Sequence, residues 1–77
     1  MAASNRSFYH WLMTHRNNVS ANEIQHFANN AFLDLTFPKQ SMDFDEISNY
    51  LEENTSYLMS MTTFDKAWDM YQAATNN

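Results

Sequence analysis

The sequence predicts an all-α fold, a small bundle of roughly four to five short helices. Apolar residues return every three or four positions, and no stretch shows a sustained two-residue alternation. Glycine is absent, which disfavours strand hairpins built on Asn-Gly or Asp-Gly turns. We therefore expect short helices around one core.

A chain of 77 residues is expected to form one domain, because it buries only about 60% of the surface that it would expose unfolded. Hydrophobic residues make up 44% of it and aromatic residues 16%, so the core should be rich for its size. No cysteine is present to form a disulfide or a thiolate metal site. We expect an ordered core over residues 6–73, with flexible ends at 1–5 and 75–77.

The first expected helix begins after Ser7, whose side chain can cap it. Arg16 lies near the expected end, where a cation suits the helix dipole. Asn17 and Asn18 are expected to close the helix, because asparagine tolerates the left-handed conformation. One face carries the apolar residues Phe8, Trp11 and Leu12.

The second expected helix opens with a capping box, in which Ser20 accepts from the amide of Glu23 and Glu23 reaches back to the amide of Ser20. Pro38 forces Phe37 out of the helical region, so this helix should end by about Leu35. Between these limits a wide apolar stripe should face the core: Ile24, Phe27, Ala28, Ala31, Phe32 and Leu35.

The third expected helix starts at Asp43, which forms a pair resembling a capping box with Glu46. Asp45 and Glu46 lie in the first turn, where the dipole favours negative charge. The helix should run to about Glu53, with Asn54 as a left-handed stop. Its expected buried residues are Phe44, Ile47, Tyr50 and Leu51.

The stretch TSYLMSM fits either a single helical turn packed through Tyr57 and Leu58 or a connector. The last helix is expected to begin at Thr62, with Asp65 three residues on. Its expected inner stripe is Phe64, Ala67, Trp68, Tyr71 and Ala74.

The charge of the chain disfavours nucleic-acid binding, because the formal net charge is −5. Affinity for a phosphate backbone depends on clustered basic residues, and the four in this chain are scattered: Arg6, Arg16, Lys39 and Lys66. The absence of glycine also excludes glycine-rich phosphate loops.

The histidines and serines give no catalytic or metal site. His10 and His15 are five positions apart, about 140° around a helix, whereas a two-histidine metal face needs a spacing near four. Ser7 beside His10 fits a helix cap better than a hydrolase triad, which would need an oxyanion hole and a cleft. We predict no enzyme activity, no metal and no cofactor.

Paired acids also have a structural explanation. Asp43 with Asp45 fits a helix start, and Glu52 with Glu53 fits a solvated face. The glycine of a calcium-binding loop is missing.

Lys39 follows Phe-Pro in a tight connection and should project into solvent beside the acidic start of the third helix. One interpretation is a solvated turn residue, paired with Asp43 or Asp45 for less than about 1 kcal/mol. The other is a polar contact patch for a protein partner, made by Lys39, Asp43 and Asp45.

Four stretches within about residues 7–71 form a recognisable set: SFYHWL, FANNAF, FPKQSMDFDEISNYLE and TTFDKAWDMY. Together they resemble the YozE-like family of short proteins from low-GC Gram-positive bacteria. The resemblance implies a fold similar to the sterile alpha motif and a cytoplasmic setting. It implies no activity and no site residues, because folds of this kind host protein interaction, self-association and nucleic-acid binding alike.

The leading functional prediction is a protein interaction or adaptor module with an unidentified protein partner. The alternative is a nucleic-acid-binding or regulatory protein, which the fold analogy supports and the charge opposes. The start of the chain lacks the pattern of a secretory signal, and no stretch approaches the ~18 apolar residues of a membrane span. We expect a soluble cytoplasmic protein with no membrane contact, and a monomer is favoured.

Overall fold

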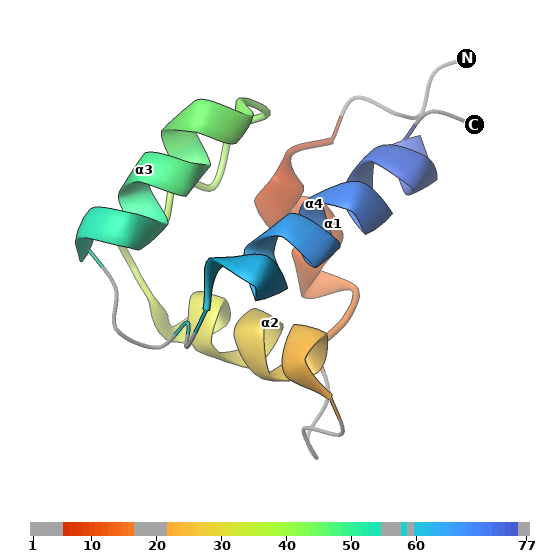
Figure 1. Ribbon diagram of the computed structural model, residues 1–77, viewed down its shortest axis with the longest axis horizontal. Helices are drawn as coiled ribbons and strands as arrows, with labels where there is room; N and C mark the ends of the chain where they lie inside the picture. The colour runs from red at the N-terminus through yellow and green to blue at the C-terminus, as the bar shows by residue number, and fades with distance from the viewer. Residues whose placement is uncertain (1–5, 17–21, 55–57, 59, 76–77) are drawn as a thin grey trace.

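The computed structural model describes residues 6–16, 22–54, 58 and 60–75. Four helices lie in these ranges: α1 (Phe8–Met13), α2 (Glu23–Leu33), α3 (Phe44–Asn54) and α4 (Met61–Thr75). No strand occurs among the described residues, and the all-α prediction is confirmed. Helices α1, α2 and α4 contact one another, and α3 packs beside them against α4 (Figure 1).

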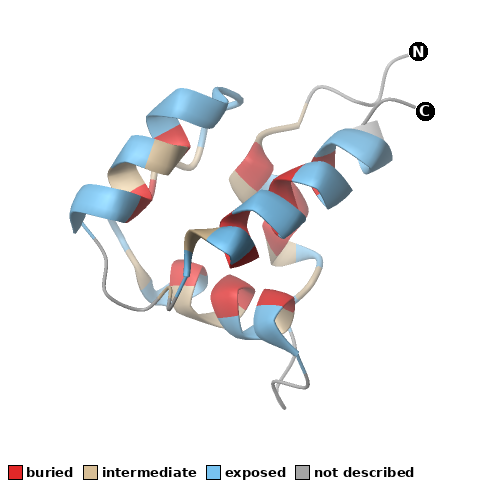
Figure 2. Ribbon diagram, viewed as in Figure 1, coloured by how far each residue is buried: buried red, intermediate tan, exposed pale blue. Residues whose placement is uncertain are grey.

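Phe8 is the centre of the core. Its ring lies 5.4–6.1 Å, between centroids, from the rings of Trp11, Phe27, Phe64, Trp68 and Tyr71. Its contacts with Phe64 and Tyr71 are edge to face, an arrangement that the ring quadrupoles favour. Buried residues face inward where the helices meet (Figure 2), so the aromatic core joins α1, α2 and α4.

The predicted inner faces are confirmed for most positions, but four apolar residues predicted to be buried are exposed, one of them Phe44 of α3. Phe32 is 44% exposed and Leu35 is 84% exposed. Leu35 is exposed because α2 ends at Leu33, so that Leu35 no longer follows the helical spacing. The ring of Phe32 contacts the Arg16 side chain instead of the core, with the guanidinium 3.4 Å from the ring centroid. Ala74 is also exposed, near the end of α4. Phe37, the residue before Pro38, is buried in the core instead.

Helix α3 is attached by fewer fully buried side chains than predicted. Ile47 and Leu51 are buried, but Tyr50 is only partly buried and Phe44 is 38% exposed. The Phe44 ring nevertheless lies 5.2 Å from the Phe64 ring between centroids. The first turn of α3 therefore covers one edge of the aromatic core while remaining in contact with solvent.

The cap at Ser7 is confirmed, because its Oγ accepts a hydrogen bond from the backbone N–H of His10 at 3.1 Å. Helix α1 ends at Met13, earlier than Arg16 suggested. The Thr14 hydroxyl donates to the Trp11 carbonyl at 2.7 Å, which closes the last turn. The Arg16 side chain therefore contacts α2 and does not lie in the last turn of α1.

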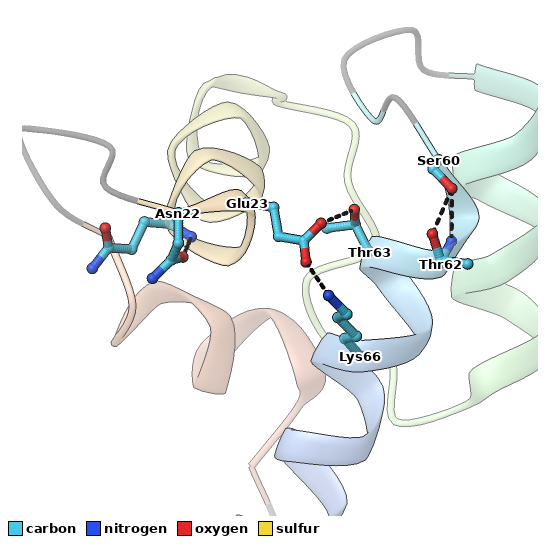
Figure 3. A network of polar contacts seen from close by, with 7 residues as sticks. Asn22, Glu23, Ser60, Thr62, Thr63 and Lys66 are labelled. Carbon is cyan, nitrogen blue, oxygen red and sulfur yellow. Dashed lines mark hydrogen bonds and ion pairs between the residues drawn. The ribbon is translucent and has the colours of Figure 1, made fainter.

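The predicted capping box of the second helix is wrong. Asn22 caps α2, and its side-chain oxygen accepts from the backbone N–H of Gln25 at 2.9 Å. The Glu23 carboxylate points across to α4, where it accepts hydrogen bonds from the Thr63 hydroxyl and the Lys66 ammonium (Figure 3). Ser20 lies outside the described residues. A tertiary contact with α4 has replaced the local one.

Asp43 caps the start of α3 as predicted, but the contact of Glu46 and the cap of α4 differ from their predictions. The Asp43 carboxylate accepts from the backbone N–H of Asp45 at 3.2 Å, whereas Glu46 accepts from the Ser41 hydroxyl at 2.8 Å. Helix α4 begins at Met61, and the Ser60 hydroxyl, not Thr62, accepts from its first turn.

The predicted left-handed stops are not seen in the described residues, none of which has a positive φ. Asn54 is the last residue of α3, and Thr75, expected in a flexible tail, is the last residue of α4. Asn17, Asn18 and Tyr57 lie outside the described residues, while Leu58 packs partly buried against the core. No helix in the described ranges combines the length and hydropathy that crossing a bilayer requires.

Candidate functional site

A groove of about 580 Å³ lies between the outer face of α1 and the connection that follows Pro38. Three basic side chains line it: Arg6, His10 and Lys39. Three apolar side chains also line it, Tyr9, Met13 and Met42, together with Ser7 and Gln40. From here on, this surface is called the groove.

The sequence places one wall of the groove on α1 by helical periodicity. Phe8, Trp11 and Leu12 turn into the core, so the intervening positions Tyr9, His10 and Met13 lie on the other side. Arg6 precedes the helix, and its carbonyl accepts a hydrogen bond from the Tyr71 hydroxyl at 2.8 Å. Burial raises the pKa of the Tyr71 phenol, which keeps this donor protonated. The wall is therefore tied to α4.

The other wall is the connection between α2 and α3. The backbone N–H of Phe8 donates to the Ser41 carbonyl at 3.3 Å, which joins this connection to the start of α1. The Phe37 and Tyr9 rings pack at 5.4 Å between centroids. Phe37 also packs against the Tyr50 ring of α3. These contacts fix the separation of the two walls.

Lys39 lies where the walls meet. Its ammonium donates to the Leu35 carbonyl at 3.0 Å and lies 5.6 Å from the centroid of the Tyr9 ring. One hydrogen bond to a neutral carbonyl leaves two ammonium donors of the three that a lysine carries. Lys39 can therefore offer charge to a ligand without giving up its present contact.

The charged side chains of the groove are basic, whereas the chain as a whole is acidic. Arg6 and Lys39 are two of the four Lys and Arg residues of the chain, and no Asp or Glu lines the groove. The nine carboxylates lie elsewhere, in a chain of formal net charge −5. A concave site lined by one sign of charge concentrates the field on a ligand of the other sign. The groove is suited to an anionic group.

Of the three residues of the predicted contact patch, Lys39 alone lines the groove. Lys39 lines the groove, whereas Asp43 and Asp45 do not, and Asp43 is engaged in capping α3. The sequence reasoning missed Arg6 and His10 as companions of Lys39. The helical spacing of positions 6, 9, 10 and 13, which alternate with the core positions 8, 11 and 12, is a signal that could have identified this face of α1.

A second hollow of about 190 Å³ lies between α2 and the start of α4. Its polar lining includes Glu23, His26, Ser60, Thr62 and Thr63. The hydroxyls of Ser60 and Thr62 bond to each other, and that of Thr63 bonds to Glu23 (Figure 3). The pKa of the Glu23 carboxyl is lowered, first by the hydrogen bond from Lys66 and then by that from Thr63. This network joins two helices.

The described histidines form no metal site. The His15 ring packs on the Trp11 ring, 4.6 Å between centroids, whereas His10 lines the groove. Across the described ranges, no three His, Asp or Glu side chains lie where they could hold one ion.

A family model matches most of the chain. The family described as YozE SAM-like fold matches residues 7–73. A UPF0346 protein of Leuconostoc mesenteroides is 73% identical over 73 residues, which cover 95% of this chain and 97% of the relative. A UPF0346 protein of Limosilactobacillus reuteri is 67% identical over 70 residues, covering 91% and 96%.

The chain is also similar to a solved structure. The solution NMR structure of the UPF0346 protein YozE from Bacillus subtilis superposes with a TM-score of 0.80 at 50% sequence identity. The match covers 88% of this chain and 83% of that one. The names of these relatives state no activity.

Proposed function

The chain belongs to the YozE SAM-like fold family, and from that premise we propose that it is a non-catalytic protein interaction or adaptor module. The fold itself fixes no function, so the proposal depends on the groove. We place the protein in the cytoplasm as part of the proposal, since a chain without cysteine suits a reducing compartment.

One observation carries the proposal: a concave site in an acidic chain gathers Arg6, Lys39 and His10 beside partly exposed apolar side chains. Binding sites commonly combine apolar walls with a few convergent polar groups. The side chain of Met42 is 51% exposed, and methionine adapts to irregular partner surfaces.

The arrangement of Ser7 and His10 supports a role without catalysis. Ser7 Oγ accepts the backbone N–H of His10 and so serves α1 as a cap. A serine nucleophile needs its hydroxyl bonded to a base that is held in turn by a third group. The described contacts give His10 no carboxylate partner of that kind.

Nucleic-acid binding is the second candidate, because the cations of the groove would accept phosphates as well as carboxylates. The acidic start of α3 opposes it. Glu46 lines a shallow hollow that continues from the groove past Lys39, so a long polyanion leaving the groove would meet a carboxylate.

The test compares three forms of the tagged chain: wild type, Lys39→Glu and Arg16→Glu. Both substitutions change the charge equally, but Arg16 lies outside the groove. Proteins captured from cells with the wild type are purified, and their affinities for the three forms are measured by calorimetry. We expect Lys39→Glu to weaken binding at least about tenfold and Arg16→Glu to leave it nearly unchanged.

Equal affinities for the two variants would overturn the groove as the contact site. A parallel titration with mixed-sequence DNA and RNA at low salt tests the second candidate. Saturable, salt-sensitive binding that Lys39→Glu abolishes would replace the proposal with nucleic-acid binding.

A further inference from the structure

We propose that the groove binds a short acidic peptide segment of the partner, in which carboxylates flank one apolar side chain. This inference rests on the proposed function and specifies the chemistry of the ligand. The occupant is argued from charge complementarity, from the apolar floor and from the limits that neighbouring side chains set on its length.

The positions of the cations require a ligand with more than one anionic group. Arg6 comes from the segment before α1, and Lys39 comes from the connection after α2. The Tyr71 hydroxyl holds the backbone of Arg6, and the Leu35 carbonyl holds the ammonium of Lys39. Charges carried by two walls are best matched by carboxylates on two sides of the ligand, because a charge-assisted hydrogen bond needs direct contact.

The apolar part of the groove requires an apolar side chain between those carboxylates. Tyr9 and Met13 pack against the core with part of their surface still exposed, and Met42 faces them from the connection. Covering this surface removes apolar area from water, at about 25 cal/mol per Å². A purely anionic ligand would leave that apolar surface in contact with water.

The surroundings limit the ligand to a short segment. The groove volume of about 580 Å³ lies within the usual range of roughly 300–1,000 Å³ for ligand sites. Beyond Lys39 the shallow hollow contains Glu46, whose carboxylate would repel further negative charge. A peptide can place a neutral or basic residue there, whereas a nucleic acid carries a phosphate at every step.

Three probe peptides test the inference on the full chain: Glu-Glu-Leu-Glu-Glu, its Gln-Gln-Leu-Gln-Gln counterpart, and Glu-Glu-Ser-Glu-Glu. Binding is followed by NMR of methionine methyl groups, because Met13 and Met42 line the groove. We expect saturable binding of the first peptide, with both methyl resonances shifted. The glutamine and serine peptides should each bind at least about threefold more weakly.

The same titration on variants locates the site. Lys39→Glu should lower the affinity for the first peptide about tenfold, which corresponds to about 1.4 kcal/mol. Arg16→Glu, with the same change of charge, should lower it less than about twofold. Arg6→Gln serves as a second groove variant with a smaller perturbation, and its affinity should also fall.

Several outcomes would overturn the inference: no saturation by the acidic peptide, equal binding of the glutamine peptide, or equal losses in Lys39→Glu and Arg16→Glu. Tighter binding of oligothymidylate would assign the groove to nucleic acid. Dimerisation that the acidic peptide reverses would assign it to a second copy of the chain. A captured partner that depends on Lys39 but is not displaced by the acidic peptide would overturn this inference and leave the proposed function standing.

Discussion

The two faces of α1 differ in their surroundings, although the helix has only six residues. The inner face, with Phe8, Trp11 and Leu12, is at most 3% exposed and holds the centre of the core. On the outer face Tyr9 and Met13 are partly buried and His10 is exposed, and the three form a wall of the groove. The comparison teaches that the fold and the binding proposed for the groove depend on different residues of one short helix.

Phe8→Ala should have the largest effect and would break the inner face. Truncating a buried phenylalanine costs about 3–5 kcal/mol, a large part of the ~5–15 kcal/mol that stabilises an ordinary domain. Phe8 touches five other rings, so the cost should lie at the upper end. Urea unfolding followed by circular dichroism measures it. A loss below about 1 kcal/mol would show that Phe8 is not the centre of the core.

Ser7→Ala should have an intermediate effect on both faces, because Ser7 caps the helix that carries them. Loss of an N-cap side chain costs about 1 kcal/mol. Ser7→Asn is the matched control, since asparagine caps as well as serine. Equal losses in the two variants, measured by urea unfolding, would contradict a capping role.

Glu23→Gln tests a stabilising contact remote from both faces, and its effect should depend on pH. A lowered pKa means that folding favours the carboxylate, so the stabilisation is complete above the ordinary pKa of about 4.3. It is lost as the pH falls through the lower pKa of the folded state. The melting temperature of Glu23→Gln should therefore be lower than that of the wild type at neutral pH.

The difference should shrink as the pH falls through the lowered pKa of the folded state, because the protonated Glu23 is then uncharged like the glutamine of the variant. The control is Glu52→Gln, which changes an exposed residue of α3. A Glu23→Gln difference that stays constant with pH would rule out the charged contact with Lys66 as its cause.

His10→Ala should have the smallest effect on stability, and it tests whether the outer face of α1 contributes to the fold. The side chain is exposed, and the hydrogen bond to Ser7 uses the His10 backbone N–H. We expect a change within about 0.5 kcal/mol, measured by urea unfolding, together with weaker binding of the acidic probe peptide. A large loss of stability would mean that the outer face also holds the fold together.

The sequence was sufficient for the helices whose signals are local. The Ser7 cap, the inner face of α1 and the end of α2 before Pro38 follow from a few neighbouring residues. The inner stripe of α4 follows from its periodicity and is buried except at Ala74. These features depend on chain geometry, which every helix shares.

Features set by tertiary contacts could not be predicted in the same way. Glu23 had a plausible local partner, but α4 offered it a hydroxyl and a cation. Phe32 has the spacing of a core residue, yet it lies on the last turn of α2 under the Arg16 side chain. In the groove, Lys39 was predicted as a contact residue, whereas its proximity to Arg6 depends on how the connection packs on α1.

The hydrogen bond from Tyr71 to the Arg6 carbonyl brings the entry of the folded region next to its exit. A circular permutant, with the two ends of the folded region joined by a short linker and new ends opened elsewhere, should therefore retain the fold. The same proximity would let the domain be inserted into a surface loop of a reporter protein without pulling that loop apart.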